Sequence, residues 1–573
     1  MDSNQLSEIL CMVALKKVPP DIVISNATVF NSITGEFLKG QSIWIKDGWI
    51  AYVGPERDPV IGDNTQVIDA QEKVILPGLI EGHTHIMNLT GLEEFVRHVI
   101  PSGTTTVITE TIELATVAGI DGFKYFINAM RDQPIRFYHT IAPLCGLTSQ
   151  EEIHAPRAEA YRQFFRDPQC LGLGEVYWAN MFLEGEQGER VRDLAAMARS
   201  YGKLVEGHTA GASDNKLQAY TALGVSSCHE PITEKEVVER LRLGYWVMIR
   251  QGGIRKELDE VAGVFKKGID TRRIILCTDS MDPEGFISEG YLDAAVRHAI
   301  KLGIRPAQVY QAVTINVAEH FGLDRMIGSI TPGKQADLVM IPGAEKYLPE
   351  LVMCRGKVIY RDGKALVRPR KESYPRHMFD TVKIDSFSIP SLPEKGKARV
   401  MELVSRLVTK EGVMNIGDKA DWKDVNLLLA LERTGSRGTF LGLIKGFGLR
   451  EGACGSTMCW DTPDMIVIGR DIESMEMVVE RLRELGGGAV VAIKAQMIAE
   501  YPAPLCGVVT LDSMETARNR LQHLEESLKR LGVPWEKPLL TLNTLGTAAI
   551  PHLRITHHGY VRLRDRAVLP LEI

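Results

Sequence analysis

Two histidines separated by a single residue, His83 and His85, carry the clearest chemical signal in the sequence. They follow the apolar run at 74–80, which contains a Pro-Gly pair. Side chains on a strand alternate between its faces, so residues two apart project to the same side and both imidazoles can reach one metal ion. Such a pair alone is often incidental. A preceding strand-like run, however, suits a site at the carboxyl-terminal mouth of a barrel, and we interpret the pair as metal ligands.

Further donor residues stand at the ends of four more apolar runs: Glu175, His208, His229 and Asp279. Any one of them could be a hydrogen-bonded residue at a strand end. Metal binding explains the whole set better than hydrogen bonding does, because four histidines and two carboxylates recur at one structural location. Imidazole and carboxylate together suit Zn, Mn or Fe(II), and the set is large enough for two ions. The sequence therefore predicts a metallohydrolase site.

The elements that must position these residues follow from the hydrophobic periodicity. From residue 73 to 325, strand runs alternate with helical stretches such as 189–201 and 234–243, which predicts a parallel sheet in a (β/α)8 barrel. Residues 1–72 and 326–385 have the pattern of short strands. A proline- and charge-rich linker follows, and residues 395–573 have the pattern of an α/β domain with amphipathic helices. The fold class is α/β.

Length and composition indicate a large soluble enzyme. With 573 residues and 45% hydrophobic content, the chain can form several domains with sizeable cores. Its formal charge of −6 gives no sign of a nucleic-acid or membrane-surface partner. Nine cysteines without regular spacing argue against a disulfide framework and favour a reducing cytoplasm. We find no convincing signal peptide and no apolar run of transmembrane length, and we expect a homo-oligomer.

A family resemblance adds to this interpretation. Residues 76–85 read Leu-Pro-Gly-Leu-Ile-Glu-Gly-His-Thr-His and resemble the first-strand signature of the amidohydrolase superfamily. Segments 101–107, 173–175 and 277–279 narrow the resemblance to the adenine deaminase family, as do 444–449 and 485–488 near the C-terminus. The resemblance extends from about residue 22 to the end of the chain. It implies that 1–72 and 326–385 join in one discontinuous small β-domain beside the barrel.

The resemblance also implies a role for each donor. Most superfamily members with two metals bridge them with a carboxylated lysine, whereas here the resemblance implies Glu175 in that position. The first metal would be held by His83, His85 and Asp279. The second would be held by His208 and His229. Two ions, Mn or Fe with Zn as an alternative, would lower the pKa of a shared water from about 15.7 towards about 7. Asp279 would accept its proton and pass it to the leaving nitrogen.

The chain departs from the family pattern in segments expected near the pocket. Met87 follows Ile86 where a glutamate is usual, residues 110–113 read Glu-Thr-Ile-Glu instead of Asp-Pro-His-Glu, and Ser280 replaces a second aspartate. Residues 460–463 read Trp-Asp-Thr-Pro instead of His-Asp-Ser-His. The candidate substrate contacts are Met87, Glu110, Glu113, Ser280, Trp460 and Asp461. Since every proposed metal ligand is retained, we expect hydrolysis to be intact, while substrate recognition or an accessory metal position has changed.

Several of these residues have a structural alternative. Trp460 could stack on a planar ring or pack in the core, and Glu110 and Glu113 could contact substrate or supply charge at a helix N-terminus. His557 and His558 lie in a polar segment and are expected to form a solvated turn.

Three functions remain open on the sequence. The leading one is metal-dependent hydrolytic deamination of a 6-aminopurine, either adenine, giving hypoxanthine and ammonia, or an N6-substituted relative. The second is ring-opening hydrolysis of a cyclic amide or ureide at the same binuclear site. The third is a non-catalytic homologue that binds a metabolite, against which the retained ligands argue. In each case the partner is a small nitrogen heterocycle.

Overall fold

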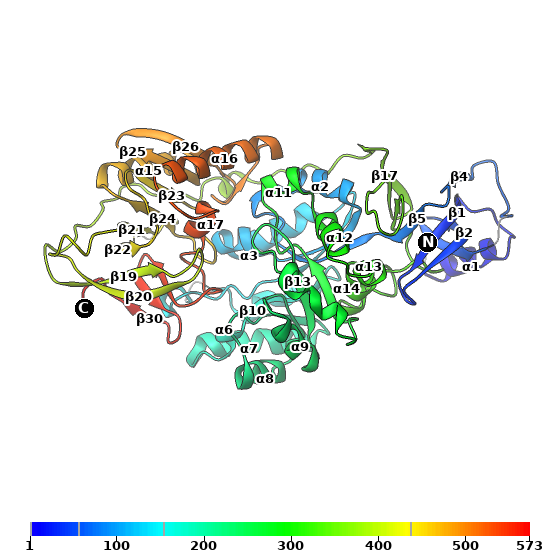
Figure 1. Ribbon diagram of the computed structural model, residues 1–573, viewed down its shortest axis with the longest axis horizontal. Helices are drawn as coiled ribbons and strands as arrows, with labels where there is room; N and C mark the ends of the chain where they lie inside the picture. Colours follow the sequence, from blue (N-terminus) through cyan, green and yellow to red (C-terminus); the bar gives the residue numbers. More distant parts are fainter. Residues whose placement is uncertain (1–2, 56–57, 153–154, 436–437) are drawn as a thin grey trace.

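The computed structural model describes residues 3–55, 58–152, 155–435 and 438–573, and the molecule has three parts along its long axis (Figure 1). An N-terminal β-sheet lies at one end, parallel strands with their helices occupy the middle, and a second sheet from the C-terminal third lies at the other end. Within the described part of the chain, no helix is both long and apolar enough to cross a membrane.

The N-terminal sheet combines strands from both sides of the barrel segment. Its order is β18-β17-β16-β15-β5-β1-β2-β3, with β4 paired to β1, and α1 (Ser3–Ala14) packs on β2 and β3. The strands are β1 (Ile22–Asn31), β2 (Glu36–Lys46), β3 (Trp49–Gly54), β4 (Gln66–Asp69), β5 (Val74–Pro77), β15 (Leu338–Ile341), β16 (Leu351–Cys354), β17 (Lys357–Arg361) and β18 (Lys364–Ala365). The antiparallel pairing of β5 with β15 joins the two chain segments in one sheet.

The apolar run at 74–80 is two strands rather than one. Val74–Pro77 belongs to the N-terminal sheet, whereas Leu79–Thr84 forms β6 in the barrel. The chain changes sheets at Gly78, where a Cβ atom would lie 2.1 Å from the hydroxyl of Thr105. Glycine is needed there because the backbone passes against a barrel strand without room for a side chain.

Eight parallel strands form the central part in two hydrogen-bonded groups. The five-stranded group is β6 (Leu79–Thr84), β8 (Thr104–Thr109), β9 (Arg136–Ile141), β10 (Cys170–Tyr177) and β11 (Leu204–His208), and the three-stranded group is β12 (Ser227–Cys228), β13 (Trp246–Arg250) and β14 (Ile274–Cys277). Backbone hydrogen bonds from Asp279 to His83 and from Ser226 to Val205 connect the groups on both sides. This curled parallel sheet fits the predicted TIM-like barrel.

Helices cover the outside of these strands, as their amphipathic patterns require. They are α2 (Leu92–Val99), α3 (Ile112–Met130), α4 (Ser149–Glu152), α5 (Ala158–Phe165), α6 (Trp178–Met181), α7 (Gly185–Ser200), α8 (Asp214–Ala222), α9 (Glu234–Arg242), α10 (Leu258–Val261), α11 (Pro283–Ser288), α12 (Leu292–Lys301), α13 (Pro306–Ala312) and α14 (Ile315–His320). The start of α9 is fixed by a capping box between Thr233 and Glu236.

The C-terminal third forms an eight-stranded sheet with helices on it. The order β20-β19-β22-β21-β24-β23-β25-β26 is antiparallel except at β19–β22. Its strands are β19 (Lys397–Leu403), β20 (Thr409–Asn415), β21 (Val425–Leu431), β22 (Thr439–Lys445), β23 (Ala453–Ser456), β24 (Met465–Gly469), β25 (Gly488–Ile493) and β26 (Gln496–Pro502). Three helices and a small sheet complete it: α15 (Ile472–Leu485), α16 (Met514–Arg530), α17 (Pro538–Asn543), β28 (Leu553–Thr556), β29 (Gly559–Arg562) and β30 (Ala567–Leu569).

A short parallel pairing joins the C-terminal third to the barrel. β7 (Leu89–Thr90), which follows the His83–His85 segment, pairs with β27 (Val509–Thr510). The phenol of Tyr501 also donates a hydrogen bond of 3.3 Å to the carbonyl oxygen of Leu89. The C-terminal sheet is therefore held beside the carboxyl ends of the barrel strands.

A buried ion pair between β9 and the N-terminal sheet generates the first prediction. The Arg136 guanidinium contacts Asp337, whose other oxygen accepts the backbone N–H of Arg355 at 2.7 Å. Replacing Asp337 with Ala leaves a buried guanidinium without its partner, so we expect the free energy of unfolding to fall by about 3–5 kcal/mol. Asp362→Ala, on an exposed turn, is the control. Equal denaturation midpoints for the two variants would contradict the prediction.

Candidate active site

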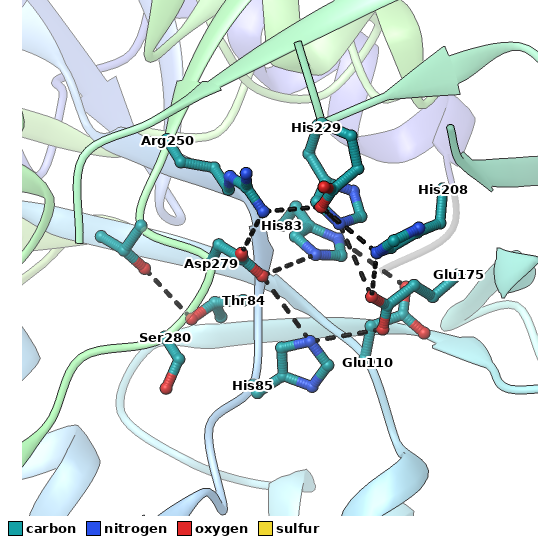
Figure 2. Close-up of polar contacts among 12 residues, drawn as sticks. His83, Thr84, His85, Glu110, Glu175, His208, His229, Arg250, Asp279 and Ser280 are labelled. Atoms are coloured by element: carbon teal, nitrogen blue, oxygen red, sulfur yellow. Dashed lines mark hydrogen bonds and ion pairs between the residues drawn. The ribbon is translucent and has the colours of Figure 1, made fainter. Parts of the chain in front are cut away.

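The carboxyl ends of the barrel strands place all six predicted metal ligands together. His83 lies in β6 with His85 just beyond it, Glu175 lies near the end of β10, and the remaining three follow or end their strands: His208, His229 and Asp279. Figure 2 shows these side chains converging on one point. Since parallel strands end at the same rim of a barrel, residues from distant parts of the chain meet there.

Glu175 lies between imidazoles contributed by three strands. One of its oxygens, Oε2, is 3.4 Å from Nε2 of His85, while Oε1 is 3.5 Å from Nε2 of His229 and 3.8 Å from Nε2 of His208. Burial would raise the pKa of Glu175, but His229 and His85 hold it well below its ordinary value. A carboxylate with its two oxygens directed at different imidazoles has the disposition needed to bridge two cations.

Asp279 faces the His83–His85 pair from the opposite side. Its Oδ1 is 3.2 Å from Nε2 of His83 and 3.7 Å from Nε2 of His85, and its Oδ2 accepts a hydrogen bond of 3.1 Å from Arg250. Burial opposes ionisation, but the hydrogen bond with His83 and the nearby charges of His229 and Arg250 lower the pKa of Asp279 to about 2. Asp279 is therefore an ionised carboxylate at neutral pH.

Backbone conformation marks the same two acids. Glu175 has a φ of 40° and Asp279 a φ of 54°, both in the left-handed region, and Ser280 has a φ of 105°. Such conformations cost about 1–3 kcal/mol in residues other than glycine and persist where the surrounding structure imposes them, often at functional sites. In β10 the conformation coincides with a register shift between Leu173 and Val176, which redirects the Glu175 side chain.

Carboxylates behind the histidines fix their orientation. Nδ1 of His85 is 2.7 Å from Glu113, so Nε2 is the nitrogen turned towards Glu175. A ligand histidine commonly donates its other N–H to a carboxylate in this way. Buried Glu81 accepts the backbone N–H groups of His83 and Thr278, which ties β6 to the end of β14.

Two groups at this site were missed by the sequence analysis. Oε1 of Glu230 lies 3.2 Å from Nε2 of both His208 and His229, closer than Glu175 does, and Arg250 contacts Glu230 at 2.6 Å. Arg250 also donates a hydrogen bond of 2.8 Å to Glu257. A signal existed for each residue: Glu230 directly follows a proposed ligand, and Arg250 ends the apolar strand β13, to which the sequence analysis assigned no site residue.

The donor set fits divalent transition ions. Three groups of buried or half-buried donors each lie within 4.8 Å of one another: His83, His85 and Glu175; His83, His229 and Asp279; and Glu175, His208 and His229. Burial and His229 lower the pKa of His83 to about 4, so His83 is the neutral imidazole that a metal requires. Buried carboxylates at this density are costly without cations to pair with them. Asp279 groups with His229 as well as His83, so the donors do not separate cleanly into a trio and a pair.

Glu110 occupies an unexpected position beside these donors. Its Oε1 is 3.8 Å from Nδ1 of His83, and its buried Oε2 has no hydrogen-bond partner among the described residues. Gly174 makes room for it, because a Cβ atom there would lie 2.1 Å from that oxygen. Burial and the charge of Glu175 raise the pKa of Glu110 to about 8. Its place is therefore behind the donor cluster.

A cavity of about 250 Å³ opens in front of the donors. Four of the six candidate substrate contacts line it: Met87, Glu113, Trp460 and Asp461. Glu110 does not, and Ser280 instead lies towards a neighbouring small cavity, where its hydroxyl accepts a hydrogen bond from Asn88. Much of the remaining wall is apolar and comes from both the barrel and the C-terminal third: Ile112, Ile232, Ile254, Leu407, Val408, Met458, Val508, Ile550 and Pro551.

Comparisons with known proteins show which families this chain resembles. The amidohydrolase family pattern matches residues 74–359, and that of the adenine deaminase C-terminal domain matches residues 402–567. An adenine deaminase of Moorella thermoacetica is 32% identical over 96% of this chain and 96% of its own length. Adenine deaminase 2 of Carboxydothermus hydrogenoformans is 32% identical over 98% and 99%, and an adenine deaminase of Cenarchaeum symbiosum is 29% identical over 98% and 94%.

The donor cluster predicts the metal content of the purified protein. We expect this donor cluster to hold up to two divalent transition ions per chain, and a His83→Ala, His85→Ala double variant should lose at least one of them. Lost imidazoles cannot be replaced by water at equal affinity. Elemental analysis measures the stoichiometry, with His523→Ala on an exposed face of α16 as the control. Full occupancy in the double variant would exclude these histidines as ligands.

Proposed function

Since this chain belongs to the adenine deaminase family of amidohydrolases, we propose that it hydrolyses the exocyclic C–N bond of a 6-aminopurine. The products would be ammonia and hypoxanthine from adenine, or the corresponding amine from an N6-substituted adenine. The observation that carries this proposal is the convergence of six imidazole and carboxylate donors at the floor of a ligand-sized cavity.

We further propose that two divalent ions, Mn or Fe with Zn as an alternative, bind this donor set. His83, His85, His208, His229, Glu175 and Asp279 would hold them, and Glu230 is placed to contribute as well. When bound, such ions lower the pKa of a coordinated water to about 7, so that hydroxide is available at neutral pH. Mixed imidazole and carboxylate donors favour these metals over Mg²⁺ or Ca²⁺.

Asp279 is the candidate for proton transfer. Its low pKa keeps it ionised, so it can accept a proton from the attacking water. Arg250 holds one carboxylate oxygen, which leaves the other directed at the His83–His85 pair. The same carboxylic acid can then donate its proton to that nitrogen. Glu175 would bridge the two metals and orient the reacting groups.

The cavity wall supports a changed substrate preference within this reaction class. Met87 lies beside the donors where the family pattern has a glutamate, and Ile112 lies where it has a histidine. The polar groups left for a purine ring include Tyr177 and Asp461, which are joined by a hydrogen bond of 2.9 Å. An apolar wall accommodates an alkyl substituent on the amino nitrogen, or a different nitrogen heterocycle.

We also propose a division of the chain for experiments on its parts. The small β-domain would comprise 1–72 and 326–385, the barrel 73–325, and the C-terminal domain 395–573. The two groups of parallel strands would be parts of one (β/α)8 barrel, supported by the backbone hydrogen bonds that join them on both sides. A cytoplasmic homo-oligomer remains our expectation from the sequence.

Asp279→Asn tests the proton-transfer role. Asparagine keeps the size of the side chain and some metal-binding ability but removes the base, so we expect turnover to fall by at least about 10²-fold. Metal content is measured in the same preparation, and the exposed Asp270→Asn on the barrel surface is the control. Near-normal turnover at normal metal content would assign the proton to another group.

A panel of substrates tests both the proposed deamination and the proposed change in substrate preference. With one metal loading, kcat/KM is measured for adenine, N6-methyladenine and several cyclic amides, and the product is identified as ammonia, an amine or a free carboxylate. We expect adenine to be the poorer purine, because each unsatisfied polar group costs about 1–3 kcal/mol while a buried methyl group gains about 0.8 kcal/mol. If adenine alone has a kcat/KM above about 10⁵ M⁻¹s⁻¹, the proposed change in substrate preference is wrong. Ring opening without amine release would overturn the deaminase proposal.

A further inference from the structure

A second cluster of metal-type donors lies where the C-terminal third meets the barrel. Glu151 in α4, on the barrel side, and His557 and His558 in the turn between β28 and β29 each offer a donor atom within 4.8 Å of the others. None of the three belongs to the site described above or lines its cavity. Two imidazoles and one carboxylate are a donor set typical of Zn²⁺ and related ions.

His557 is held as a metal-binding histidine would be. Its Nδ1 lies 2.8 Å from Oδ1 of Asp464, and the other oxygen of that carboxylate accepts the His557 backbone N–H at 2.8 Å. The Asp464 side chain is fully buried, so this orientation is fixed. With Nδ1–H donating to Asp464, the lone pair of a neutral imidazole is on Nε2, the arrangement found behind ligand histidines.

Glu151 presents an unsatisfied oxygen at the same place. Its Oε2 accepts the backbone N–H groups of Leu147 and Thr148, whereas the buried Oε1 has no hydrogen-bond partner among the described residues. A buried carboxylate oxygen without a partner is costly. Glu151 forms no ion pair within 4.0 Å in the described structure, so a cation between it and the histidines would satisfy it.

His558 makes the cluster accessible. Its ring lies 3.9 Å from that of His557, between centroids, and its side chain is exposed to solvent. An ion could therefore enter without opening the domain interface. The predicted turn is present, but only His558 is exposed in it, because the His557 side chain is 9% exposed.

We propose that Glu151, His557 and His558 form an additional binding site for a borderline divalent ion such as Zn²⁺, separate from the hydrolytic centre. The bound ion would join the α4 segment of the barrel to the small C-terminal sheet. Three protein donors leave a fourth position for water. Because the site lies on the interface that brings Asp461 to the cavity, its role would be to hold the C-terminal part in place over the active site.

The test uses the full chain and Zn²⁺ or Co²⁺ alone as the probe. In the His83→Ala, His85→Ala background, ion stoichiometry is measured by equilibrium dialysis with and without Glu151→Gln or His558→Ala. We expect each added substitution to remove about one ion per chain and to reduce the rise in Tm that the probe ion produces. Exposed His558 can be replaced without disturbing the fold, and His523→Ala is the matched control.

Equal stoichiometry and equal Tm shifts in the parent and the added variants would overturn the proposal. In that case any ion that the parent variant binds lies elsewhere, and Glu151, His557 and His558 hold none. The experiment does not depend on deaminase activity, so failure of this site and failure of the proposed function are distinguishable. A parallel measurement in the otherwise unaltered chain should show one ion more than the hydrolytic centre binds.

Discussion

The concentration of buried carboxylates at the barrel mouth is the constraint on which the site depends. Glu110, Glu175, Glu230 and Asp279 each lie within 3.8 Å of a histidine nitrogen of the site, and Arg250 is the guanidinium that contacts two of them. Such a group is stable only if protons or metal ions balance the charge. The elevated pKa of Glu110 and the lowered pKa of Asp279 are opposite responses to this constraint within one site.

The C-terminal third completes the cavity that the barrel leaves open. Asp461 reaches Tyr177 at the end of β10, and the Thr547 hydroxyl also contacts the Asp461 carboxylate. The Tyr177 ring packs edge-on against His208 at 4.8 Å between centroids. The position of the C-terminal part is thereby coupled to a proposed metal ligand, so a change at this interface would alter both the cavity and the donor geometry.

The sequence predicted where a residue lies whenever a local pattern alone determined its position in the fold. A polar residue that ends a buried parallel strand must lie at the barrel mouth, so all six donors could be placed together before the structure was known. Glu230 and Arg250 were not predicted, because Glu230 lies one residue beyond a strand-end ligand and a cationic side chain at the end of β13 does not have the type of a metal donor. The split of the run at 74–80 between two sheets depends on the close approach of Gly78 to Thr105, which no local periodicity encodes. Likewise, Glu110 and Glu113 are three residues apart, yet one lies behind the donors and the other lines the cavity.

Different residues supply the metal donors and the apolar cavity wall. Substrate recognition can therefore change while hydrolysis is retained. The donors are held by strand ends, by hydrogen bonds such as that from His85 to Glu113, and by mutual charge, so each loss would leave buried charge unpaired. The wall residues Met87 and Ile112 contribute apolar contact and little else, so their replacement alters affinity by the burial of a few methylene groups. A polar residue lost from the wall removes discrimination against other rings but leaves the charge balance of the donors intact. The departures inferred from the sequence follow that division, because Met87 and Ile112 line the cavity wall while all six proposed donors are present.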